Sequence, residues 1–223
     1  MKMSENRIYI YKRYERFWHW SQALLIIVLM ITGFEIHGSY SLMGFKDAVD
    51  LHTLAAWTML VIWAFTIFWQ FTTGEWRQYL PSMRNVGAMI LYYTVGIFKD
   101  MPHPFRKTAV QKHNPLQRLA YLALLAFISP LIWVSGLLYL FYGNWAQLGL
   151  DQYFTLETVA LVHTAGAFMM AAFFFIHVYL TTTGHTIFAH IKAMITGWED
   201  VHDEGGHASH RCDDPDVYHL QCA

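Results

Sequence analysis

The chain has 223 residues, of which 55% are hydrophobic and only 14% are charged. Soluble domains are usually about one quarter charged, so this composition excludes an ordinary soluble domain and favours a helical membrane protein. The formal net charge of −1 gives no indication of nucleic-acid binding. The two cysteines both lie near the C-terminus and suggest no disulfide framework.

Four apolar segments are long enough to cross the hydrocarbon core of a bilayer, which requires about 20 helical residues. In chain order, the predicted spans are about Phe17–Ile36, Leu51–Phe71, Leu116–Tyr142 and Leu156–Thr182. A shorter apolar segment, Val86–Phe98, is flanked by positive charges, and we expect it to lie in the membrane interface. The predicted fold is therefore an all-α integral membrane bundle of four transmembrane helices with one interfacial helix.

Lysine and arginine are distributed unevenly between the segments that connect these spans. The loops 37–50 and 143–155 contribute only Lys46, and every other lysine and arginine lies before the first span, between the second and third, or after the fourth, Arg118 just inside the third. The positive-inside rule then predicts that both termini are cytoplasmic and that the two loops with few lysines and arginines face outward. The predicted location is the bacterial cytoplasmic (inner) membrane, with several passes.

The composition changes after Val201. We predict a transmembrane domain over residues 1–201 and a polar cytoplasmic tail, rich in His, Cys and Asp, over residues 202–223. The spacing of the metal-competent side chains in the tail is irregular and contains no CxxC pair, so a metal site and a disordered tail both remain open. The candidate ligands there are His202, His207, His210, Cys212, His219 and Cys222.

Two histidines lie inside the fourth predicted span. His163 and His177 are fourteen residues apart, which places them on nearly the same helix face and about 21 Å apart along the axis. His19 enters the first span from the cytoplasmic side, so we expect it at the level of His177. His52 enters the second span from the outer side, so we expect it at the level of His163.

Two imidazoles that face each other across a bundle supply the two axial nitrogens of a six-coordinate haem b iron. Small residues, among them Gly33, Gly136 and Gly166, lie at depths where a flat ring would approach the backbone. A proton relay is the main alternative, but it predicts acidic or basic partners inside the spans, and only Glu35 and Glu157 come close. The histidine pattern therefore predicts two b haems.

Several motifs give the chain a resemblance to a known family. They are RFWHW at 16–20, DLHTLAAW at 50–57, KHNPLQRLAYL at 112–122 and the segment 162–201. The chain resembles the di-haem cytochrome b family of respiratory membrane subunits. This family includes the gamma subunit of membrane-bound formate dehydrogenase, the b-type cytochrome of nickel–iron hydrogenase and thiosulfate-reductase-type cytochromes. The resemblance implies that His19 and His177 bind the cytoplasmic-side haem and that His52 and His163 bind the outer one.

The resemblance also implies a quinone site beside the cytoplasmic haem, where the third span begins. The residues are Asn114 and its neighbours Lys112, His113 and Gln117. An Asn amide bonds a quinone carbonyl in either orientation, whereas the Asn-Pro pair by itself indicates a turn and a helix start. Arg16 has two interpretations: it neutralises a haem propionate, or it is only a positive-inside anchor.

The predicted function is that of a membrane-anchoring di-haem b cytochrome subunit of a respiratory oxidoreductase. It would carry electrons between the quinone pool and a partner subunit. The quinone would be menaquinone or ubiquinone. The partner would be an iron–sulfur or multi-haem subunit, together with a catalytic subunit, on the outer face. Whether the chain counts as an enzyme by itself is left open. Two alternatives are a stand-alone transmembrane haem reductase, which the short outer loops disfavour, and a haem-free anchor or proton-coupled transporter.

Overall fold

A computed structural model describes residues 6–81, 85–99, 101, 104–105, 112–182 and 186–201 of the chain. Within these residues, four helical segments are long and apolar enough to cross a membrane. They are α1 (Arg13–Ile36), α2 (Phe45–Thr73), the continuous segment Pro115–Leu140 and α7 (Leu156–Thr181). The prediction of four spans is confirmed, and α2 begins six residues earlier than expected.

The outer surfaces of these helices are apolar. On α2, the side chains of Leu54, Phe65 and Phe68 are all more than half exposed. A water-soluble protein rarely exposes a contiguous apolar surface of this kind, whereas a bilayer covers it. The arrangement is that of a multi-pass membrane protein.

The third long segment is not a uniform α-helix. It consists of α4 (Pro115–Ala123), the π-helical turn η3 (Leu124–Ile128) and α5 (Ser129–Leu140). Pro130 is the second residue after the π turn. It lacks a backbone N–H, and its ring crowds the carbonyl one turn earlier. A wider turn at this position accommodates the proline and changes the helical phase of α5 relative to α4.

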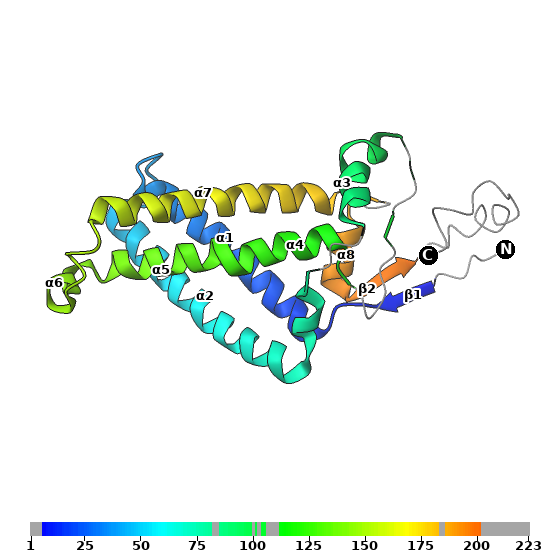
Figure 1. The fold of residues 1–223 in the computed structure, drawn as a ribbon, viewed down its shortest axis with the longest axis horizontal. Helices are drawn as coiled ribbons and strands as arrows, with labels where there is room; N and C mark the ends of the chain where they lie inside the picture. The colour runs from blue at the N-terminus through cyan, green and yellow to red at the C-terminus, as the bar shows by residue number, and fades with distance from the viewer. Residues whose placement is uncertain are drawn as a thin grey trace, which may run out of the picture.

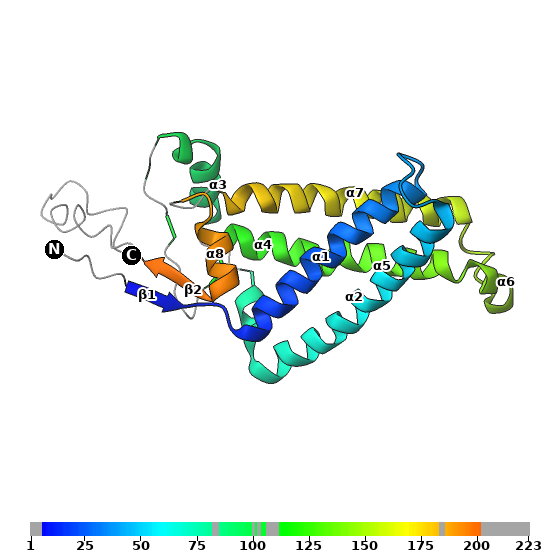
Figure 2. The ribbon, with the colours of Figure 1, turned by 180° about the vertical axis from the view of Figure 1, so that it is seen from behind.

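The four segments form two antiparallel hairpins, α1 with α2 and α5 with α7. Figure 2 shows the α1–α2 hairpin crossing α4, α5 and α7 obliquely. Aromatic contacts join the two hairpins: Phe34 on α1 meets Phe168 on α7, and Trp63 on α2 meets Trp133 on α5. The space between the hairpins is therefore bounded on one side by α1 and α2 and on the other by α5 and α7.

At one end of the molecule lie α6 (Trp145–Leu148), the short 3-10 turn η4 (Tyr142–Asn144) and the loop between α1 and α2 (Figure 1). The carboxylate of Glu35 organises this loop, because its Oε1 accepts hydrogen bonds of 2.8 Å from the backbone N–H groups of Leu42, Met43 and Gly44. Gly44 is also the N-cap of α2, so the carboxylate lies against the positive end of that helix.

The opposite end carries the remaining short elements (Figure 1). They are η1 (Glu75–Tyr79), α3 (Val86–Thr94), η2 (Gly96–Lys99) and α8 (Ala189–Thr196). Within the segment Val86–Phe98, predicted as an interfacial helix, residues Val86–Thr94 form α3. Its place in the membrane interface stays a prediction, as does the cytoplasmic location of the termini.

A small two-stranded β-sheet at this end is an addition to the predicted helical bundle. Strand β1 (Asn6–Tyr9) pairs antiparallel with β2 (Trp198–Val201), with Tyr9 opposite Trp198. The rings of these two residues have centroids 5.2 Å apart. Gly197 precedes β2 with a φ of +88°, and its carbonyl accepts the N–H groups of Ile10 and Tyr11.

Candidate functional site

The structure brings the four predicted histidines together in two pairs. His19 on α1 faces His177 on α7, with ring centroids 6.1 Å apart. His52 on α2 faces His163 on α7, with ring centroids 6.4 Å apart. Each pair therefore joins one hairpin to the other, and α7 contributes to both. The four side chains are half-buried.

The spacing of each pair fits a single iron between its two rings. Metal–imidazole bonds are about 2 Å long and the ring centre lies about 1 Å further on, so two axial imidazoles have centroids about 6 Å apart. Among the described residues no group of three or more His, Cys, Asp or Glu side chains could hold a metal ion. The donor set thus suits a prosthetic group that brings its own equatorial ligands. That these histidines bind iron stays a proposal.

A hydroxyl group fixes the proton on the ring of His52. Thr32 Oγ1 on α1 lies 2.8 Å from His52 Nδ1 and donates its own hydrogen to the carbonyl of Val28, one turn earlier. With this hydroxyl hydrogen on the carbonyl of Val28, Oγ1 accepts from His52, and Nδ1 carries the proton. The other ring nitrogen, Nε2, is then left with a free lone pair for a metal.

His163 is held in the same way by the other hairpin. Its Nδ1 lies 3.1 Å from Ser135 Oγ and 3.2 Å from the carbonyl oxygen of Ile132, both on α5. Ser135 donates to the carbonyl of Leu131 at 2.6 Å. A carbonyl oxygen only accepts, so Nδ1 of His163 must carry the proton. Both rings of this pair therefore present Nε2 to the space between them.

A glycine follows each of these hydroxyl residues and gives its histidine room. A Cβ atom at Gly33 would lie 3.4 Å from Cε1 of His52, and one at Gly136 would lie 3.0 Å from Cε1 of His163. The two glycines were identified from the sequence as small residues near a flat ring, but Thr32 and Ser135 were missed. The available signal was a hydroxyl residue directly before a glycine in the interior of a helix, once in each hairpin.

The His19–His177 pair has different surroundings. The ring of Phe173 stacks on His177 with an interplanar angle of 5°, and Trp20 meets the edge of His19. His19 Nδ1 is buried and makes no hydrogen bond to any described residue. This orphaned nitrogen is one of few such buried atoms, and it distinguishes the pair from the one that Thr32 and Ser135 support.

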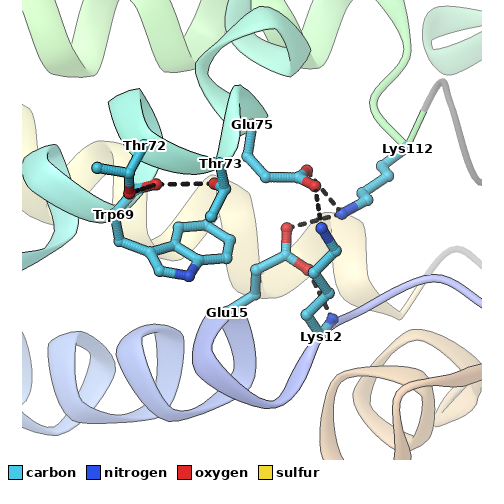
Figure 3. A network of polar contacts seen from close by, with 7 residues as sticks. All are labelled: Lys12, Glu15, Trp69, Thr72, Thr73, Glu75 and Lys112. Carbon is cyan, nitrogen blue, oxygen red and sulfur yellow. Dashed lines mark hydrogen bonds and ion pairs between the residues drawn. The ribbon is translucent and has the colours of Figure 1, made fainter.

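Lys112, a predicted quinone residue, lies in an ion-pair network at the end of the bundle that carries α8 (Figure 3). Its Nζ is 2.7 Å from Glu15 Oε1 and 3.1 Å from Glu75 Oε2, and its side chain is 4% exposed. Lys12 binds the other oxygen of Glu75. Burial would raise the pKa of the Glu75 carboxyl, but the hydrogen bonds from Lys12 and Lys112 outweigh burial and lower this pKa. The hydrogen bond to Glu75 in turn raises the pKa of Lys12.

Asn114 and Gln117, also predicted for quinone, form the N-terminal cap of α4. Asn114 Oδ1 accepts the backbone N–H of Gln117 at 2.8 Å, and Gln117 Oε1 accepts the backbone N–H of Asn114 at 3.0 Å. The amide nitrogen of Asn114 donates to the hydroxyl of Tyr93 at 3.3 Å. This reciprocal capping box is the helix start that the Asn-Pro pair indicates. A contact with quinone stays a prediction.

His113, the fourth predicted quinone residue, lies in an aromatic cluster. Its ring centroid is 5.4 Å from that of Tyr79 and 5.0 Å from that of Tyr121. Burial raises the pKa of the Tyr79 hydroxyl, so this group stays protonated at physiological pH. The cluster connects η1 to α4 next to the ion-pair network.

Arg16 binds within the protein at the end of α8. Its guanidinium donates to the carbonyl of Ile195, and Trp20 Nε1 donates to the carbonyl of Met194 at 3.2 Å. Both acceptors are in the last turn of α8, where carbonyls lack helical partners. Arg16 Nε is buried and has no hydrogen-bond partner among the described residues. The predicted tail ligands His202, His207, His210, Cys212, His219 and Cys222 lie outside the described residues.

Comparisons with known proteins identify the family. The model of the family described as prokaryotic cytochrome b561 matches residues 10–197. A protein of Escherichia coli (strain K12) named "Putative cytochrome YdhU" is 30% identical over 201 residues, which cover 86% of this chain and 74% of that protein. The predicted resemblance to membrane b-type cytochromes is confirmed, and the matched residues include all four paired histidines. The chain belongs to the prokaryotic cytochrome b561 family, whose members are membrane proteins that bind haem b and transfer electrons.

Proposed function

We propose that the chain is the membrane subunit of a respiratory oxidoreductase, that it holds two b haems, and that it carries electrons between a partner subunit and quinone. The observation that carries this proposal is the pair of histidine couples, with centroids 6.1 Å and 6.4 Å apart, that join the two hairpins. Family membership supports haem b, and the two couples support the number two.

Each residue of the site has a defined task in this proposal. A haem, when bound, supplies a carrier for one electron at each level. His19 and His177 hold the first, and His52 and His163 the second. Since His163 and His177 are fourteen residues apart on one helix, α7 fixes the distance between the two levels at about 21 Å along its axis. The buried Nε of Arg16, one helical turn before His19, is the group that we propose for a propionate.

Quinone chemistry is proposed at the end of the bundle that carries Asn114. Proton exchange at that site requires access to water, and the distribution of lysine and arginine supports a cytoplasmic location. Lys112, Asn114 and Gln117 already have internal partners, so a bound quinone would have to share or replace their hydrogen bonds. His113 and Tyr93 are the neighbours best placed to take part in this exchange, because each contacts this start of α4.

The partner that exchanges electrons at the other level is proposed to be an iron–sulfur or multi-haem subunit on the outer face. The segments at that end are η4, α6 and the loop held by Glu35. They are too short to form a large domain of this chain. A catalytic subunit attached there would complete the complex. The proposed location is the bacterial cytoplasmic membrane.

A pyridine haemochrome assay on the purified full chain tests the proposal. We expect two non-covalent b haems per chain, and one in the His163→Ala and His177→Ala variants. His37→Ala is the matched control, since His37 is exposed at the end of α1 and faces no other histidine among the described residues. Haem-free protein, or an unchanged content in both variants, would refute it.

A further inference from the structure

We propose that Thr32 and Ser135 are the positioning residues of the His52–His163 pair: they fix the Nδ1–H tautomer of both ligands and make them electron-rich. This inference rests on the proposed function, since it concerns ligands of the second haem. It assigns a role to two residues whose side chains touch neither iron nor substrate.

The first argument is the chemistry of the two hydroxyl groups. Thr32 is fully buried and Ser135 is 4% exposed, so neither hydroxyl group is accessible to water. Each donates to the carbonyl four residues earlier in its own helix and can therefore only accept from the imidazole. An acceptor on Nδ1–H orients the ring and raises the basicity of Nε2, the nitrogen that would bind the iron.

The second argument is the correspondence between the two hairpins. In α1, Thr32 is followed by Gly33, and these two residues contact His52 on the partner helix α2. In α5, Ser135 is followed by Gly136, and these two contact His163 on the partner helix α7. The same hydroxyl–glycine device thus occurs twice, on opposite sides of one cofactor space. A single helix-internal Ser or Thr would be unremarkable, because such residues often bond back to their own helix.

The third argument is the contrast with the other level. His19 Nδ1 is buried without a hydrogen-bond partner among the described residues. Hydrogen bonds to the axial ligands are one of the main ways in which a protein sets the reduction potential of a haem. An electron-rich imidazole stabilises ferric iron over ferrous iron, so the two hydroxyl groups lower the potential of the haem between His52 and His163.

A redox titration of the haem-loaded full chain tests this role. Thr32→Val removes the hydroxyl acceptor of His52 with little change of shape. Ser135→Ala likewise removes the hydroxyl acceptor of His163, whose Nδ1 keeps the carbonyl of Ile132. We expect the midpoint potential of one haem to rise in each variant, by on the order of a tenfold change in the ferrous-to-ferric ratio at a fixed applied potential. The double variant should shift the same haem further, and the other haem should keep its potential.

Two controls separate positioning from packing. Thr58 on α2 also donates to the carbonyl four residues earlier, at 2.8 Å, but no histidine is bonded to it among the described residues, so Thr58→Val should change neither potential. Thr32→Ser keeps the hydroxyl and should retain the wild-type potential. If Thr32→Val fails to load the haem, restored loading in Thr32→Ser supports the role equally.

The outcomes for the two proposals are distinguishable. A wild-type chain that contains no haem overturns the proposed function and this inference with it. A chain that holds two haems, with potentials that stay the same in the double variant or rise equally for both haems, overturns only the role of Thr32 and Ser135. Electron paramagnetic resonance of the oxidised protein gives an independent readout, because the low-spin ferric signal of one haem should change and that of the other should not.

Discussion

The ammonium nitrogen of Lys112 lies 2.7 Å from a carboxylate oxygen of Glu15, although the two residues are 97 positions apart in the chain. Glu15 is in the first turn of α1, and Lys112 lies two residues before Asn114, the N-cap of α4. Because Lys112 also bonds Glu75 after the end of α2, one buried ammonium group holds together the ends of three long segments. The network is thus a structural junction, and Glu15 lies about one helical turn before His19 on α1.

Replacing Lys112 with Met should strongly destabilise the protein. The change leaves the carboxylates of Glu15 and Glu75 buried without their shared cation, which costs about 3 kcal/mol. Thermal unfolding of the purified chain in detergent measures the effect. Lys46→Met is the control, because Lys46 forms only an exposed pair with Asp50 and its loss should leave the unfolding midpoint unchanged. Equal midpoints for Lys112→Met and wild type would show that the junction does not stabilise the fold.

The same network should confer a defined pH dependence of stability. The folded-state pKa of Glu75 is below its ordinary value of 4.5, so its contribution is complete above pH 4.5 and is lost as the pH falls through the lowered pKa. The pKa of Lys12 is raised above 10.5, so its contribution is complete below pH 10.5 and is lost at higher pH. The unfolding midpoint temperature should therefore decrease as the pH is lowered below 4.5. This decrease should be less steep in Glu75→Gln. An acid limb of unchanged slope in that variant would contradict the assignment.

The pairing of the histidines gives a further prediction, which depends on haem binding. His19→Ala and His177→Ala should remove the same haem, and the double variant should lose no more than either single one. His52→Ala should remove the other haem and therefore add to the effect of His19→Ala. Redox-resolved absorption spectra identify which haem remains. Additive losses for His19 and His177 would mean that the two residues serve different cofactors.

Two glycine substitutions should have opposite effects. The Cβ of Gly136→Ala would lie 3.0 Å from the ring of His163, whose Nδ1 is tied to α5 and cannot easily move. We expect a destabilisation of about 1–3 kcal/mol from this overpacking. In Gly33→Ala the distance to His52 is an ordinary 3.4 Å, so the gain in helix propensity, roughly 0.5–1 kcal/mol, should dominate. Chemical unfolding of the haem-free chains compares them, and a reversed order would refute this geometry.

Asn114 allows the helix cap to be separated from a role in quinone binding. Asn114→Asp keeps the oxygen that caps Gln117 but loses the amide N–H, whereas Asn114→Ala loses both. The Ala variant should be less stable by about 0.5–2 kcal/mol, and the Asp variant should remain near wild type. If the amide also binds quinone, haem reduction by a quinol analogue should be slowed in both variants. Normal reduction in the stable Asp variant would confine Asn114 to capping.

The large features of the fold could be predicted because they depend on properties local to the chain. The length of each apolar segment predicts the spans, and helical phase with alternating direction places His52 near His163. The bond between Thr32 and His52 depends on how α1 and α2 are rotated against each other, and no single-helix pattern contains this information. The burial of Lys112 could not be predicted from the sequence either, because a lysine in a polar loop is normally solvated. Strand β1 was missed because its partner lies almost two hundred residues away.

The π-helical turn Leu124–Ile128 has a consequence for how the chain can vary. On one side of it, α4 places Tyr121 against His113, and on the other, α5 places Ser135 against His163. One residue of insertion or deletion in a helix rotates everything beyond it by about 100°. The number of residues between Tyr121 and Ser135 is thus more constrained than their identity. Substitutions in this segment should accumulate among functional relatives, while single-residue length changes should be rare unless a second change restores the phase.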